Sequence, residues 1–246
     1  MDPRAQIGVF GKHPAYGDFL RAGVSDPIVE AMMQWLDPTL AQLRDDLGND
    51  WAAFWDQAQP VRFWIGRGVF GKTLAGIMVA SHDRVGRRYP LVLMGEGVAQ
   101  AAPVVDPDQT VYAALEYHLR QMQPGIGAKA LLEGMSVSMP SETPQAAQTG
   151  PTVWAHHPHA DLAALLGAAV PVEAEHARLT RAMFWAPGGD GRAACWLSHD
   201  RMPQSGALGW LLGGVPAQDD IQTGSPVSSD LSPGIKDSQE AKSHAP

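Results

Sequence analysis

The stretch from Gly66 to Thr73 has the spacing of a phosphate-binding loop. It reads Gly-Arg-Gly-Val-Phe-Gly-Lys-Thr, and a strand-like apolar run at residues 61–65 precedes it. In such a loop, backbone amides hold phosphate while the lysine and the threonine open a helix. Residues 74–80 contain Gly76 in mid-run and lead into a charged loop, so that helix is weakly indicated. We expect a glycine-rich connection between strands; the alternative is a P-loop-type nucleotide-binding protein.

Two other clusters contain residue types found in catalytic or metal sites. Residues 81–83 read Ser-His-Asp, but side chains of adjacent residues point apart and cannot align as nucleophile, base and orienting group. Residues 156–161 hold three histidines and an aspartate, but Pro158 interrupts the helical spacing that would bring them together. Cys195 lies in a strand-like run and is expected to be a buried, inert thiol. We therefore expect no catalytic residue, no metal and no cofactor.

Two loops that mix glycine, proline and opposite charges are more unusual. Residues 11–19 and 81–90 each follow a strand-like run, so both are expected at one edge of a sheet, where loops often have functional roles. One interpretation is a polar recognition surface. The other is internal bracing, with Asp18 or Asp83 accepting charge-assisted hydrogen bonds from arginines, including one contact between the loops. The candidate interaction or bracing residues are Gly11, Lys12, Pro14, Gly17, Asp18, Arg62, Ser81, Asp83, Arg84, Gly86, Arg87 and Pro90.

The hydrophobic pattern that must position these loops alternates short strands with amphipathic helices. Apolar runs bounded by glycine or charged residues indicate buried strands, and apolar residues three or four apart behind a capping residue indicate helices. Asp37-Pro38, inside a helical pattern, predicts a kinked or broken helical pair. Strands are expected at residues 6–10, 61–65, 75–80, 89–94, 152–155, 183–186 and 193–197, and helices at 26–36, 37–47, 51–55, 107–122, 161–169 and 206–212.

This alternation predicts an α/β fold: a single compact domain, residues 1–215, with a central mixed β-sheet flanked by helices. From residue 216 to residue 246 aromatic residues are absent, and serine, proline and aspartate are frequent. Such a segment buries too little apolar surface to offset the entropy lost on ordering. We expect a disordered C-terminal tail.

The composition excludes several classes of partner. The 246-residue chain has a formal net charge of -8 and no cluster of lysine and arginine, so nucleic acid is not an expected partner. No apolar run approaches the length of about 20 residues that spans a bilayer, and the N-terminus lacks a signal-peptide pattern, so no membrane insertion is expected. A single cysteine cannot form an internal disulfide, which favours a cytoplasmic location.

The two charged loops are also where the sequence resembles a known family, the type VI secretion-associated TagF proteins. The resemblance consists of residues 8–14 and 17–19, then Arg62-Phe63, then residues 81–87 and 89–91. Weaker similarity follows in residues 184–185, 201–203 and 211–212. Arg88 and the long tail depart from the family pattern, and the family does not typically keep a lysine at the position of Lys72.

The resemblance implies a compact α/β domain without a cofactor that represses assembly or firing of the secretion system after translation. It further implies binding to a forkhead-associated scaffold protein. Some relatives carry a fused phosphatase domain, for which this chain has no room. We therefore expect a protein-binding repressor rather than an enzyme; a structural accessory subunit of the secretion apparatus is the other alternative.

Overall fold

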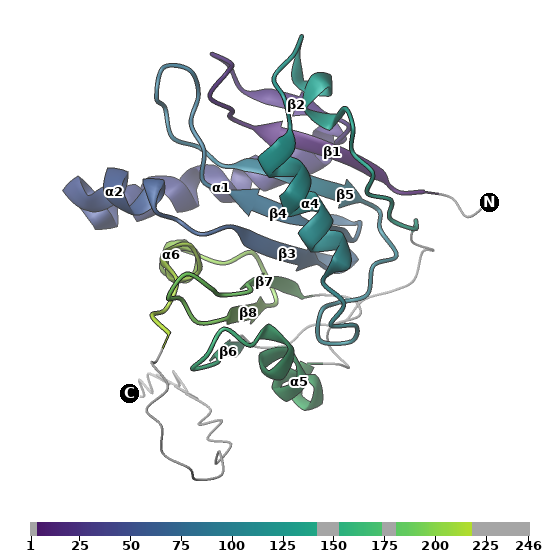
Figure 1. Cartoon of the computed structure of the whole chain (residues 1–246), viewed down its shortest axis with the longest axis vertical. Coiled ribbons are helices and arrows are strands. Elements are labelled where there is room, and N and C mark those ends of the chain that lie inside the picture. Colours follow the sequence, from purple (N-terminus) through teal and green to yellow (C-terminus); the bar gives the residue numbers. More distant parts are fainter. Residues whose placement is uncertain (1–3, 142–152, 174–180, 218–246) are drawn as a thin grey trace, which may run out of the picture.

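A central sheet of eight strands organises the molecule, in the order β2-β1-β5-β4-β3-β7-β8-β6 (Figure 1). The computed structural model describes residues 4–141, 153–173 and 181–217. The α/β class with a central sheet and flanking helices is confirmed, but the expected mixed sheet is wrong, because all seven strand pairs are antiparallel. The strands are β1 Gln6–Gly11, β2 Leu20–Ala22, β3 Val61–Ile65, β4 Leu74–Val79, β5 Leu91–Glu96, β6 Val153–His156, β7 Ala182–Ala186 and β8 Cys195–His199.

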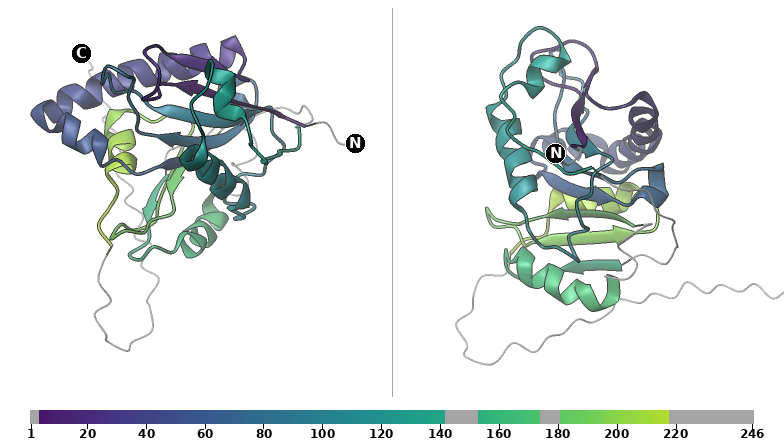
Figure 2. Two further views of the ribbon diagram at one scale, coloured as in Figure 1. Left: turned by 45° about the horizontal axis from the view of Figure 1, so that its top comes forward. Right: turned by 90° about the vertical axis from the view of Figure 1, so that its right-hand side faces the viewer.

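Helices cover both faces of this sheet, as the right-hand view of Figure 2 shows. One face carries α1 (Asp26–Leu47), α2 (Trp51–Asp56) and α6 (Ser205–Gly213). The other carries α4 (Thr110–Gln121), α5 (Leu162–Glu173) and the 3-10 helix η2 (Ala128–Leu132). Two short elements, η1 (Gly48–Asp50) and α3 (Arg67–Phe70), lie in connections. Among the described residues, the apolar side chains of the central strands are therefore buried on both faces.

Two hydrophobic cores follow from the alternation of side chains along each strand. In β5, Leu91 and Leu93 belong to the core beneath α4, whereas Val92 and Met94 belong to the core beneath α1. Successive side chains of a strand point to opposite faces, so a strand buried on both faces is apolar at nearly every position. This explains why the central strands appear in the sequence as continuous apolar runs.

Helix α1 is a single element, and the predicted break at Asp37-Pro38 is wrong. The helix runs through Pro38, which is exposed, while Leu36, Leu40 and Leu43 are buried against the sheet. A proline inside a helix costs about 3 kcal/mol, whereas burying a leucine contributes about 1.5–3 kcal/mol. Three buried leucines therefore outweigh the interruption.

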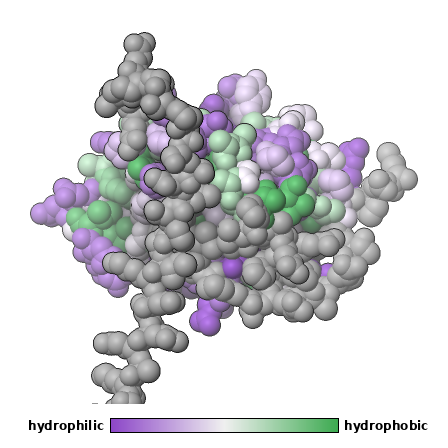
Figure 3. All heavy atoms as spheres, turned by 90° about the horizontal axis from the view of Figure 1, so that it is seen from below, coloured by the Kyte–Doolittle hydropathy of each residue, from purple (hydrophilic) through white to green (hydrophobic). Residues whose placement is uncertain are grey.

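The other predicted elements are present; the strand at 61–65 has the predicted bounds, and the rest have shifted ends. The short β2, α3, η1 and η2 were not predicted. The predicted strand at 89–94 begins two residues later, at Leu91. The predicted tail lies, except for residues 216 and 217, outside the described residues and stays a prediction. In the described part of the chain, no helix is long and apolar enough to cross a membrane. Seen from below, the surface at the end formed by α1 and α2 carries a small apolar area bordered by hydrophilic residues (Figure 3).

Close packing at the centre of the sheet makes Gly76 a sensitive position. A methyl group there would lie 2.5 Å from the Leu93 carbonyl oxygen and 2.8 Å from the Phe63 ring. We expect Gly76→Ala to lower the free energy of unfolding by about 1–3 kcal/mol, because the flanking strands cannot separate without breaking the ladder. Urea denaturation monitored by circular dichroism would measure this change.

Gly167, exposed on α5 with no atom within 4 Å of an added methyl group, offers the matched control. Gly167→Ala should leave stability unchanged or raise it by up to about 1 kcal/mol, because alanine favours the helix. Equal destabilisation by both substitutions would contradict the packing argument.

Candidate functional site

The two charged loops meet at one end of the sheet because of strand register. Gly11 at the end of β1 pairs with Leu91 at the start of β5, and Val79 at the end of β4 also pairs with Leu91. The loop after β1 and the loop between β4 and β5 therefore emerge at the same end of the sheet. We call residues 11–19 the first loop, residues 81–90 the second loop, and the two together the loop corner.

Asp83 of the second loop is the centre of the loop corner. Its side chain is fully buried, and its Oδ2 accepts hydrogen bonds from Lys12 Nζ at 3.0 Å and Arg87 Nε at 2.6 Å. Its Oδ1 accepts the backbone N–H groups of Val85 at 3.1 Å and Arg87 at 2.9 Å. Burial alone would raise the pKa of this carboxyl, but the Arg87 backbone and the two cations together hold the pKa well below its ordinary value.

Three further contacts tie the two loops together. Arg87 Nη2 donates to the Gly17 carbonyl oxygen at 2.7 Å, and the Arg84 N–H donates to the Tyr16 carbonyl oxygen at 2.8 Å. The Lys12 N–H donates to the Pro90 carbonyl oxygen at 3.2 Å. Together with the ion pair from Lys12 to Asp83, these bonds fix the relative position of the loops.

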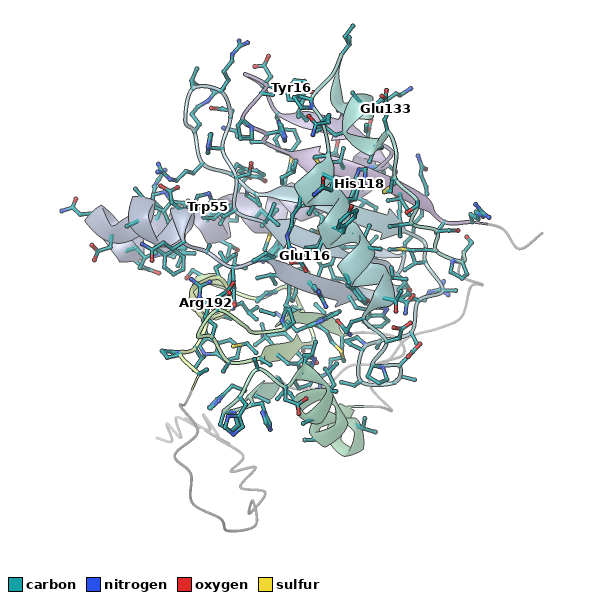
Figure 4. The ribbon with its side chains drawn as sticks, in the orientation of Figure 1. Tyr16, Trp55, Glu116, His118, Glu133 and Arg192 are labelled. Carbon is teal, nitrogen blue, oxygen red and sulfur yellow. The ribbon has the colours of Figure 1, made fainter. Side chains whose placement is uncertain are left out.

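The second loop is also anchored on α1 and α2. Trp55 Nε1, at the left in Figure 4, donates to the Ser81 carbonyl oxygen at 2.8 Å. Arg88 forms a two-bond ion pair with Asp56, at 3.1 and 2.7 Å, and Tyr89 Oη donates to Asp37 Oδ1 at 2.9 Å. Burial, then the bond to Asp37, raises the pKa of Tyr89, so the phenol stays a neutral donor.

A third segment supports the first loop from the other side. Tyr16 Oη donates to the Gly125 carbonyl oxygen and accepts the Gly125 N–H, both at 2.9 Å. The ring of His13 packs edge-on against Tyr16 with ring centroids 5.5 Å apart. Burial, and then the neighbouring His82, lowers the pKa of His13, which favours the neutral ring. The first loop is thus held between the second loop and the chain that follows α4.

Two glycines of the loop corner allow backbone conformations that other residues rarely adopt. Gly11 has φ +119°, and a methyl group there would lie 2.0 Å from the Pro90 carbonyl oxygen. Gly86 has φ +85°, and its N–H donates to the Asp83 carbonyl oxygen at 2.9 Å to close a turn. Such a φ favours glycine over every other residue. Pro14 lies exposed in the first loop.

Two of the candidate residues lie where they were not expected. Asp18 is exposed and, within the described residues, makes no ion pair, so the expected contact from Asp18 to an arginine is absent. Lys12 supplies the ion pair between the loops instead. Arg62 lies outside the loop corner, beneath α4, where it pairs with Glu116 at 2.9 Å and donates to Gln109 Oε1 at 3.0 Å. Glu116 projects from α4 in Figure 4.

Several residues that complete this region could not be identified from the sequence. Asp37, Asp56 and Gly125 hold the two loops, yet they lie on other elements 32 or more residues away from their partners. Contacts of this kind depend on how the helices pack on the sheet. An alignment of relatives showing paired changes would be the signal able to reveal them.

The structure contradicts the phosphate-loop alternative. Residues 66–73 connect antiparallel strands β3 and β4, with the four-residue α3 inside the connection. Residues after Thr73 form strand β4, so the helix that a phosphate-binding loop requires after its lysine and threonine is not formed there. Lys72 Nζ instead pairs with the buried Glu96 at 2.6 Å, and Glu96 also accepts two hydrogen bonds from Ser25.

The other clusters do not assemble either. The Asp83 carboxylate is held by Lys12 and Arg87, and His82 Nδ1 contacts the Asp83 carbonyl oxygen, so residues 81–83 form no triad. In the part of the chain that the structure describes, no three histidine, cysteine, aspartate or glutamate side chains gather as metal ligands, residues 156–161 included. Cys195 is buried in β8, and burial raises the pKa of its thiol.

Comparisons with known proteins agree with the sequence resemblance. Residues 8–137, which include both loops and Gly125, match the model of the TagF N-terminal domain, described as type VI secretion system-associated. The chain belongs to the TagF family. Its fold is similar to a crystal structure of PA0076 from Pseudomonas aeruginosa PAO1, with 22% identity and a TM-score of 0.62, covering 89% of this chain and 100% of that one. No curated protein matches the chain significantly.

The contacts of Asp83 in this TagF family member lead us to expect that Asp83→Asn lowers the stability of the fold. Asparagine keeps the shape but removes the negative charge that holds Lys12 and Arg87, leaving Lys12 largely buried without a counter-charge. We expect the melting temperature at pH 7 to fall by more than about 4 °C. Differential scanning fluorimetry would measure the shift.

The same substitution should change the pH dependence of stability. The carboxyl pKa is lower in the folded protein than its ordinary value of 3.8, so ionised Asp83 stabilises the fold above that pH, and this stabilisation is lost as pH falls through and below it. The gap in melting temperature between wild type and Asp83→Asn should therefore narrow below about pH 4. Asp18→Asn, at an exposed site, is the control and should show no gap at any pH. If the difference in melting temperature between wild type and Asp83→Asn did not narrow below about pH 4, the stabilisation would not come from the ionised Asp83 carboxylate.

Proposed function

We propose that this protein is a non-catalytic regulator that represses the type VI secretion system from the cytoplasm by binding another protein. Membership of a type VI secretion-associated family supports the setting. The partner we propose is a forkhead-associated scaffold protein of the same secretion system. A single cysteine, buried in β8, is compatible with a reducing compartment.

The observation that carries this proposal is a rigid loop corner with an exposed outer surface. Its inner side is fixed by buried Asp83, while Arg84 is exposed and Val85 at the tip is 70% exposed. Loops that are held by a scaffold and present apolar and cationic side chains are typical of protein recognition surfaces, because binding then costs little conformational entropy. Arginine is also enriched at such interfaces.

Val85→Asp tests this surface directly. We expect the substitution to weaken binding of the purified forkhead-associated scaffold at least tenfold, since it places a charge in the centre of the contact, a loss of about 1.4 kcal/mol or more. The melting temperature should stay unchanged, because the Val85 side chain is exposed. Surface plasmon resonance and scanning fluorimetry would measure the two properties.

Val105→Asp is the matched control, because Val105 is another exposed valine, outside the loop corner. It should bind the scaffold like the wild type. If both valine variants bind normally, the loop corner is not the interface. If wild type fails to bind the scaffold but co-purifies in fixed stoichiometry with the assembled apparatus, the protein is a structural subunit instead.

A further inference from the structure

A hollow of about 410 Å³ lies behind the loop corner, between the second loop and the helices that anchor it. Helix α1 contributes Asp37, Leu40, Ala41 and Arg44, which are three or four residues apart and so share one helix face. Trp51 at the start of α2 forms another wall. Arg87, Arg88 and Tyr89 of the second loop complete the lining.

Charge distinguishes this hollow from the rest of the molecule. The chain carries a net charge of -8, yet three arginines line the hollow against one carboxylate, that of Asp37. Asp37 already accepts the Tyr89 hydroxyl. Arg88 is balanced by Asp56, but Arg87 shares the single charge of Asp83 with Lys12, so this group has two cations for one anion. Arg44 lies beside Asp45, so these cations are balanced overall, but of the four carboxylates only that of Asp37 lines the hollow. The surface that faces the hollow is therefore cationic.

The guanidinium groups also keep donors available. Each has five N–H donors, but Arg87 uses only Nε and Nη2 within the chain, and Arg88 likewise uses Nε and Nη2. Arg44, whose side chain is 59% exposed, makes only long bonds of 3.3 and 3.4 Å to the adjacent Asp45. In the described residues, the Nη1 groups of these arginines have no partner. They can donate hydrogen bonds to a carboxylate without breaking the contacts of the loop corner.

The apolar part of the lining limits what kind of anion fits. Leu40 is buried and Trp51 is half-buried, with its ring 4.9 Å from that of Trp55. An indole wall and a leucine beside three guanidiniums suit a side chain with an apolar stem, or an acidic residue next to an apolar one. A free inorganic anion would use only the arginines.

We propose that this hollow binds an acidic segment of the protein partner, with glutamate or aspartate carboxylates on Arg44, Arg87 and Arg88 and an apolar side chain against Trp51. This inference rests on the proposed function, since it names the chemistry by which the partner is recognised. It adds a second contact to the one at Val85, on the other side of the second loop.

Arg44→Glu is the variant that tests this proposal, because Arg44 has no part in fixing the loops. The probe is a fluorescein-labelled ten-residue peptide of glutamate and leucine, with a second peptide carrying glutamine in place of glutamate. On the full chain, we expect the acidic peptide to bind about tenfold more weakly to Arg44→Glu than to wild type, and more weakly as salt rises. The glutamine peptide should not compete.

Arg201→Glu is the matched control, since Arg201 is exposed, does not line the hollow and undergoes the same change of charge. It should bind the acidic peptide like the wild type. Equal losses in both variants would mean general charge attraction, and equal binding of the glutamine peptide would mean that carboxylates are not recognised; either result overturns the proposal. So would a gain in affinity on deleting residues 218–246, because the acidic tail would then be the occupant.

Scaffold binding by the same three proteins separates this inference from the proposed function. If wild type and Arg44→Glu bind the forkhead-associated protein equally, the acidic-segment site is wrong and the regulator proposal stands. If the acidic peptide binds through Arg44 while the scaffold does not bind at all, the hollow is an acidic-segment site and the proposed partner is wrong.

Discussion

A single buried carboxylate, that of Asp83, determines the arrangement of the region that we propose to be functional. Removing a charge from water costs several kcal/mol unless partners replace the water, and here two cations and two backbone amides do so. Those partners come from both loops. Separating the loops would leave the charge without Lys12, so two connections rich in glycine and proline behave as one rigid unit.

The sheet makes this arrangement available at little cost. Antiparallel pairing brings the ends of β1 and β4 and the start of β5 to one end of the sheet, so the loops begin close together. The helices on one face then supply Trp55, Asp56 and Asp37 to hold the second loop from behind. The position of the loops thus depends on the same core that stabilises the fold, and mutations in that core can alter the surface without touching it.

Much of this fold could be predicted from the sequence, because strands buried on both faces leave continuous apolar runs. The direction of pairing could not, since an apolar run is equally compatible with parallel and antiparallel neighbours. The bracing of the loops was inferred from residue types, but Asp18 and Asp83 both lie in loops that contain glycine and charged residues, so residue type does not distinguish them. Their difference is tertiary: Phe19 packs on Phe10 and Tyr89, with centroids 6.2 and 5.6 Å apart, and its neighbour Asp18 is left exposed.

The chemistry of arginine explains how the same side chains can brace the loops and still have donors for the partner binding that we propose. The Lys12 ammonium, which pairs with the buried Asp83 carboxylate, has little surface left for a partner, because only 16% of the Lys12 side chain is exposed. Arg87 satisfies the same carboxylate through Nε yet keeps 60% of its side chain exposed, because the planar guanidinium presents donors on more than one edge. Arg87 therefore contributes both to stability and to the binding that we propose. Among the three arginines, Arg44 lines the hollow without holding a loop, so its substitution tests the proposed binding alone.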